Sequence, residues 1–121
     1  MTKEEIKVLY SKIEGLDTND IKALVNAETP SIGGVAQIGT GCIAGTALMV
    51  GMSTLEKACK KAWEQNKKHI QSIIQNNPKS SKTIMDVICL LAPTIAQQYT
   101  GFSGMAIVGT LTIMCKQNLG L

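Results

Sequence analysis

The sequence contains no arginine, and all 12 of its basic residues are lysine. Aromatic residues are also scarce, at 3% of the 121 residues. Arginine supplies the planar guanidinium group that recognises phosphates and base edges through paired hydrogen bonds. A net charge of +3 that is carried by lysine alone therefore predicts that nucleic acid is not a partner of this protein.

The sequence has four cysteines and one histidine, and none of them falls into a metal-binding spacing. Structural zinc sites use closely spaced pairs of ligands, and no CxxC pair occurs here. Each cysteine adjoins an apolar run, which predicts buried thiols in a reducing compartment. His69 and Glu64 are five residues apart, so a helix would place them on different faces. We therefore predict no catalytic residue, no metal and no cofactor. The cysteines are Cys42, Cys59, Cys89 and Cys115.

Charged residues are absent from two long stretches of the chain. The first stretch covers the 27 residues from Thr29 to Leu55, and the second covers the 29 residues from Val87 to Cys115. Charged residues make up 17% of the whole sequence, so two such stretches require a physical cause. Either the segments lie in a bilayer, or they form helices that are buried on all sides at the centre of a core.

Residues 1–30 predict a pair of amphipathic helices. Thr2 followed by Glu5 is a capping box, and the apolar residues after it share one face, which predicts a helix over 2–14 that ends at Gly15. Asp17 or Thr18 would cap a second, short helix over 18–27. Pro30 follows this helix, and the residue before a proline is disfavoured in helical geometry.

Residues 31–52 form a glycine-rich apolar segment, which we interpret as a helix and not as a glycine-rich loop. Gly34, Gly41 and Gly45 recur at intervals of seven and four residues and would share one face. Gly41 and Gly45 form a GxxxG motif, which lets two helix backbones approach closely. We predict that these three glycines pack helices together and form the interface of a homo-oligomer.

Residues 53–77 predict one continuous amphipathic helix of about 23 residues, capped by Ser53 with Glu56. Its outer face is rich in lysine, and each lysine near an anionic lipid leaflet contributes about 1 kcal/mol to binding. These lysines are therefore candidates for contact with a membrane surface. The alternative is an ordinary solvated face of a surface helix. The candidate residues are Lys57, Lys60, Lys61, Lys67 and Lys68.

Residues 83–117 predict a broken apolar helical segment. Two helices, over 83–99 and 102–117, would join near Thr100 and Gly101. A helix needs about 20 apolar residues to cross a bilayer, so each of these two is too short to span one alone. The segment therefore suits either a re-entrant pair of helices or a buried core.

Part of the first uncharged stretch resembles an enzyme family. The segment is similar to the opening helix of formiminotransferase-cyclodeaminase-type enzymes. The similarity lies in the run Thr29-Pro30-Ser31-Ile32-Gly33-Gly34-Val35-Ala36, continued by Gly41, Ala44-Gly45 and Met49-Val50. The resemblance covers about 25 residues. It implies an all-helical, dimeric folate enzyme. The sequence lacks the full PGGG of that family, and no site residue carries over.

These observations predict an all-α fold with a single domain over 1–121. The domain would be a compact bundle of five or six helices, in which glycine-rich apolar helices pack against amphipathic ones. We expect a small, self-associating, non-enzymatic protein that acts at or inserts into a membrane, like a bacterial or phage pore former, holin or effector. The alternative is a soluble cytoplasmic homo-oligomer that serves as a scaffold or small-molecule binder. The cyclodeaminase-like enzyme is a remote third.

The expected partners and location follow from the same patterns. We expect the chain to bind copies of itself and an anionic membrane. The first 30 residues are charged and amphipathic, which predicts no cleavable signal peptide. The expected location is therefore the cytoplasmic membrane or the cytoplasm.

Overall fold

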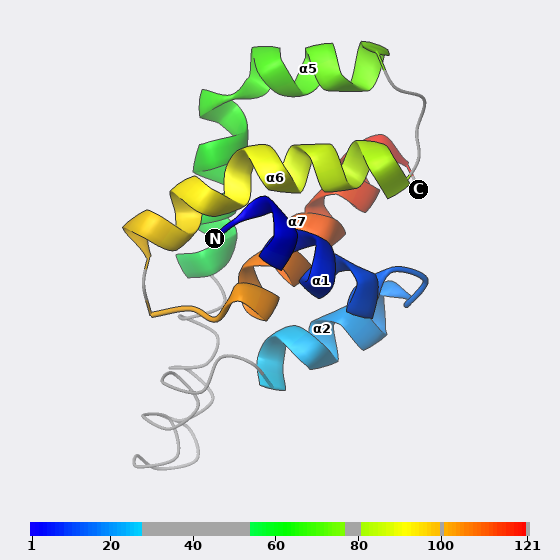
Figure 1. Ribbon diagram of the computed structural model, residues 1–121, viewed down its shortest axis with the longest axis vertical. Helices are drawn as coiled ribbons and strands as arrows, with labels where there is room; N and C mark the ends of the chain where they lie inside the picture. The colour runs from blue at the N-terminus through cyan, green and yellow to red at the C-terminus, as the bar shows by residue number, and fades with distance from the viewer. Residues whose placement is uncertain (28–53, 77–80, 100, 121) are drawn as a thin grey trace.

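The computed structural model describes residues 1–27, 54–76, 81–99 and 101–120. Six helices contain 87% of these described residues, which include no strand, so the predicted all-α class is confirmed. The glycine-rich segment 31–52, with Gly34, Gly41 and Gly45, lies outside the described residues. The helices are α1 (Lys3–Ile13), α2 (Thr18–Ala27), a helix over 54–65, α5 (Lys67–Asn76), α6 (Ser81–Gln98) and α7 (Gly104–Leu119) (Figure 1).

The first two helices begin at the caps that the sequence predicts. The side chain of Thr2 accepts a hydrogen bond from the amide of Glu5 at 3.1 Å, which starts α1. The carboxylate of Asp17 accepts one from the amide of Asp20 at 2.8 Å, so Asp17 caps α2. Between the helices, Gly15 has φ +89°, a conformation that side chains with a Cβ rarely adopt.

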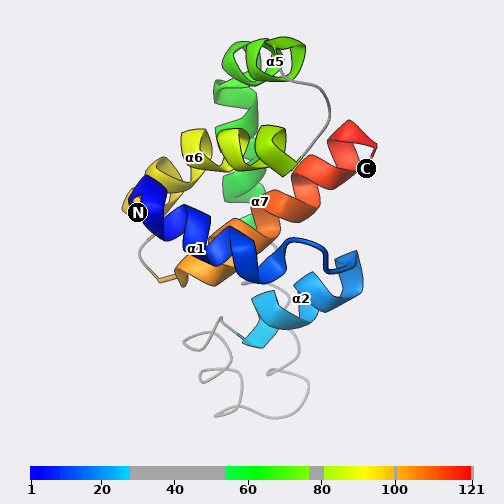
Figure 2. The ribbon, with the colours of Figure 1, turned by 45° about the vertical axis from the view of Figure 1, so that its right-hand side comes forward.

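Helix α7 lies at the centre of the described helices. Figure 2 shows it running between α1, α2 and α6, and it packs against all three. Every residue from Met105 to Thr112 is buried, and a run of that length covers more than two helical turns. Because α7 is buried on all of its faces, a charged side chain has no solvated position along this run. Central burial therefore accounts for the lack of charge over this part of the second uncharged stretch.

No helix in the described parts of the chain is both long enough and apolar enough to span a membrane.

The lysine-rich segment differs from its prediction, because it is two helices and not one. The chain turns at Asn66, between the helix over 54–65 and α5 (Figure 1). The Asn66 amide donates to the carbonyls of both Ala62 and Trp63 at 3.1 Å, and its side-chain Nδ2 donates to Ala62 at 2.9 Å. A side chain that competes for a helical carbonyl in this way disturbs the regular ladder. The prediction of a continuous helix over 53–77 is therefore wrong.

The apolar segment after residue 81 forms two helices, as the sequence predicts. Helix α6 ends at Gln98 and α7 begins at Gly104. The hydroxyl of Ser103 accepts a hydrogen bond from the amide of Ala106 at 3.1 Å and caps α7. Gly120, with φ +71°, ends α7 in the left-handed conformation typical of helix C-termini.

Helices α2 and α7 are in close contact at Gly109. A Cβ placed on Gly109 would lie 2.5 Å from Cγ2 of Val25 and 3.5 Å from Cγ2 of Ile21. Real Cβ atoms essentially never approach another atom to 2.5 Å. Gly109 therefore makes room for the Val25 side chain of α2, and either that side chain or the two helices would have to shift to accept a Cβ at this position.

We predict that Gly109→Ala lowers the free energy of unfolding by about 1 kcal/mol, because overpacking outweighs the gain in helix propensity. Urea denaturation measures this change. Gly101→Ala is the control, because nothing lies within 4 Å of its Cβ position. In the double variant, Val25→Ala should remove part of the cost of Gly109→Ala. Strictly additive effects of the two substitutions would contradict the contact.

Candidate functional site

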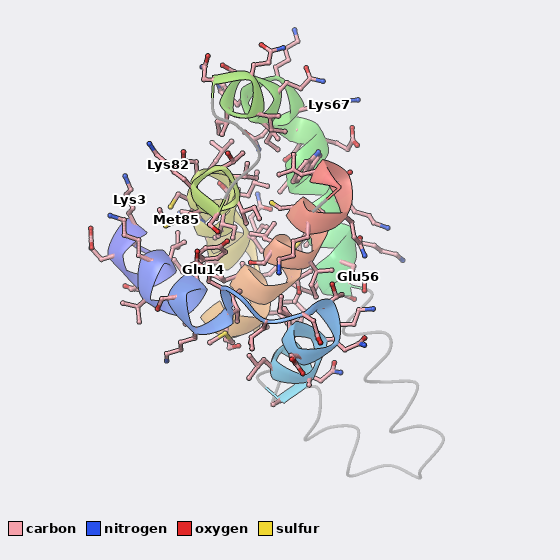
Figure 3. The ribbon with its side chains drawn as sticks, turned by 90° about the vertical axis from the view of Figure 1, so that its right-hand side faces the viewer. Lys3, Glu14, Glu56, Lys67, Lys82 and Met85 are labelled. Carbon is pink, nitrogen blue, oxygen red and sulfur yellow. The ribbon has the colours of Figure 1, made fainter. Side chains whose placement is uncertain are left out.

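The five candidate lysines are all exposed, but they do not form one face. The turn at Asn66 divides them between the helix over 54–65 and α5. Figure 3 shows Lys67 beside α5, well separated from Glu56 near the start of the other helix. Within the ranges that the structure describes, none of the five forms an ion pair. The five are Lys57, Lys60, Lys61, Lys67 and Lys68.

A cavity of about 350 Å³ lies between α2, the helix over 54–65 and α7. Val25, Ile113 and Met114 supply its apolar wall, and Thr110 also lines it. Its other lining residues are polar or charged and exposed at the surface: Lys22, Asn26, Glu56, Lys60 and Gln117. The cavity thus combines a largely buried apolar side with a polar rim, as most small-molecule sites do.

A second hollow, of about 360 Å³, lies beside the first. The two share Lys60, Met114 and Gln117 as lining residues, and we call the pair of hollows the α7 groove. The second hollow adds Trp63, Glu64 and Asn118. Trp63 is the only tryptophan in the sequence and is partly buried, so its fluorescence reports on this groove.

Thr110 is the one residue among those described whose buried side chain has a polar atom without a hydrogen-bond partner. Its side chain is 7% exposed, and its Oγ1 is fully enclosed. Thr112, two residues later, is also buried, but its hydroxyl donates to the carbonyl of Val108 at 2.7 Å. Buried polar groups in native proteins are nearly always paired, so the unpaired hydroxyl of Thr110 requires an explanation.

The charges at the groove come from different helices. Lys22 belongs to α2 and Lys60 to the helix over 54–65, and Glu56 precedes Lys60 by one turn. The cavity therefore has two cationic side chains and one anionic side chain at its rim. Lys116, which also lies on α7, has a different role, because its Nζ donates to the carbonyl of Leu16 at 3.0 Å and holds the turn between α1 and α2.

Two of the cysteines are buried apolar side chains, as predicted. Cys59 and Cys115 are fully buried, and burial raises the pKa of each thiol to about 12. Cys89 is partly exposed, and Cys42 lies outside the described residues. The described residues include no group of three or more His, Cys, Asp or Glu that could hold a metal ion.

Thr110, Lys22 and Gly109 are not among the residues that the sequence pattern predicts as functional. The signal for Thr110 was weak, because a threonine within an apolar helix usually bonds to its own backbone, as Thr112 does. The groove itself is assembled from residues that are far apart in the chain. No spacing within one helix could have brought Lys22 and Lys60 to the same cavity as Thr110.

Paired substitutions test whether the Thr110 hydroxyl is unpaired. Thr110→Val should raise the free energy of unfolding by about 1 kcal/mol, since it removes a buried polar group that has no partner. Thr112→Val should lower it by about 1 kcal/mol, since it removes a buried hydrogen bond. Thermal or urea denaturation of the unliganded protein measures both changes. A loss of stability in both variants would show that Thr110 has a partner.

No family model matches the chain, and no curated protein or solved structure matches it closely enough to identify a relative. The segment that resembles cyclodeaminase-type enzymes, over residues 29–50, lies outside the described residues. The function is therefore argued from the geometry of the groove and the distribution of charge.

Proposed function

We propose that this chain is a non-enzymatic binding protein that holds a small amphipathic molecule in the α7 groove. The cavity between α2, the helix over 54–65 and α7, with its apolar wall and its polar rim, carries this proposal. Ligand pockets typically measure about 300–1,000 Å³ and combine apolar walls with a few polar groups. The cavity lies at the lower end of that range, which favours a small ligand.

Binding of a small neutral amphiphile tests the proposal. We predict that 1-hexanol produces a saturable change in the fluorescence of Trp63, because its chain would contact Met114 and displace water from the groove. Gln117→Phe should weaken this binding at least threefold, since Gln117 is exposed and lines both hollows. Gln97→Phe is the matched control, because Gln97 is also exposed, on α6, and lines neither hollow.

Two outcomes would contradict a binding function at this site. One is a fluorescence response of Trp63 that never saturates with hexanol. The other is a saturable response that Gln117→Phe and Gln97→Phe reduce to the same degree, which would place the binding elsewhere.

A second candidate function is peripheral contact with an anionic membrane, and the exposed, unpaired lysines favour it. Lysines attract anionic lipid through their charge alone and need no buried apolar segment for this contact. Self-association through Gly34, Gly41 and Gly45 stays a separate proposal, because these residues lie outside the described ranges.

Two triple variants of equal net charge test the membrane contact. Changing Lys61, Lys67 and Lys68 to Gln should weaken binding to phosphatidylserine vesicles at least tenfold more than changing Lys3, Lys7 and Lys12 to Gln. All six lysines are exposed, so folding should be unaffected in both variants. Co-sedimentation at low and high salt measures the binding, which should fade as salt screens the charges. Equal losses in the two variants would mean that the lysines on either side of the turn at Asn66 bind lipid no better than those of α1.

A further inference from the structure

We infer that the exposed face of α1 binds the same face of a second copy of this chain. The two α1 helices would lie antiparallel, with the two-fold axis at Val8. Glu4 of each copy would then pair with Lys12 of the other. This inference goes beyond the proposed binding function and does not depend on it, because none of these residues lines the α7 groove.

Val8 is the first argument, because it is the one large apolar side chain that the described residues leave exposed. It is 58% exposed. The opposite side of α1 packs into the core through Ile6, Tyr10 and Ile13, which are all buried. Figure 3 shows α1 at the edge of the molecule. A single exposed valine is ordinary on a protein surface, so the residues around it must decide what it contacts.

The charges on either side of Val8 are the second argument. Glu4 precedes Val8 by four residues and Lys12 follows it by four, so all three share one face, at steps of about 6 Å along the helix. Both charged side chains are exposed, and neither forms an ion pair in the described part of the chain. In an antiparallel pair with its axis at Val8, each Glu4 lies level with Lys12 of the other copy. The face is therefore complementary to itself, as a two-fold interface requires.

The same charges disfavour other partners for this face. A parallel pair of α1 helices would place Glu4 against Glu4 and Lys12 against Lys12, and like charges repel. An anionic membrane would attract Lys12 and repel Glu4. An antiparallel second copy satisfies both ends of the face at once.

A hollow of about 520 Å³ beside α1 is the third argument. Its apolar side is formed where Leu9 and Met1 cover the start of α7, since a Cβ on Gly104 would lie 2.9 Å from Cδ1 of Leu9 and 3.2 Å from Cε of Met1. Lysine side chains cover apolar surface with their methylene groups and keep the ammonium group in water. Lys12 of the second copy would therefore cross the hollow and reach Glu4. The hollow is lined by Met1, Glu4, Glu5, Val8, Leu9 and Gly104.

Exchanging the two charges tests the pairing on the whole chain, with sedimentation equilibrium over a range of concentrations as the measurement. We expect the unmodified chain to dimerise. Glu4→Lys should raise the dissociation constant of the dimer at least about tenfold, because the two-fold axis makes one substitution reverse two contacts, and one exposed pair contributes up to about fivefold. Lys12→Glu should have the same effect. An equimolar mixture of the two variants should dimerise as tightly as the unmodified chain, since every contact between them joins opposite charges.

Two further variants serve as controls. Lys7→Glu makes the same charge change as Lys12→Glu at an exposed position about 100° around α1 from Val8, so it should leave the dissociation constant unchanged. Val8→Lys should prevent dimerisation, because it brings two like charges together at the axis. Circular dichroism should show the same helix content in every variant, since all the substituted side chains are exposed.

Four results would overturn the inference. The unmodified chain stays monomeric at every concentration, or Val8→Lys leaves the dimer intact. Lys7→Glu weakens the dimer as much as Lys12→Glu does, or the mixture of the two charge variants fails to dimerise. None of these results bears on the binding of hexanol in the α7 groove, so the proposed function is tested separately.

Discussion

The packing of α7 against α1, α2 and α6 is the constraint on which the rest of the structure depends. This helix has no solvated face over Met105–Thr112, so each of its positions must fit a neighbouring helix. Gly109 shows how tight that fit is, because Val25 occupies the space where its Cβ would be. Burying apolar side chains on every face gives α7 a large share of the hydrophobic stabilisation of the fold.

The same constraint shapes the proposed site. A helix buried on all sides cannot carry charge, so its only polar side chains over that run are two threonines. One of them, Thr112, satisfies its hydroxyl within the helix, whereas Thr110 does not. The neighbouring helices α2 and 54–65 then contribute lysines at the rim of the cavity. The groove therefore has apolar core side chains along its wall and charged side chains from the surface helices at its rim.

The local structure was largely predictable from the sequence. The starts of three helices follow from local sequence patterns. Each cap depends on a hydrogen bond between residues three positions apart, at Thr2, at Asp17 and just before Gly104. The turn at Asn66 escaped prediction, since asparagine occurs in regular helices as well as in bent ones. The lysines were correctly expected on the surface, but the turn separates them into two groups.

The tertiary arrangement was less predictable, for a physical reason. A central core helix and a membrane segment both need a long uncharged sequence, so composition alone could not decide between them for Val87–Cys115. In the structure, other helices of the same chain bury α7 over Met105–Thr112, which accounts for the absence of charge in that part of the stretch. The groove was not predictable, because Lys22, Lys60 and Thr110 come together only after the helices have packed.

Amide hydrogen exchange, resolved by residue in buffer without lipid, tests the central position of α7 most directly. Helix α5 packs on α6 and buries only Ile70 fully, so its amides should exchange through local opening. The amides of Met105–Thr112 should instead be the slowest in the protein and exchange only through global unfolding. If these amides exchange as fast as those of α5, or become protected only when lipid vesicles are added, α7 is not the centre of the core.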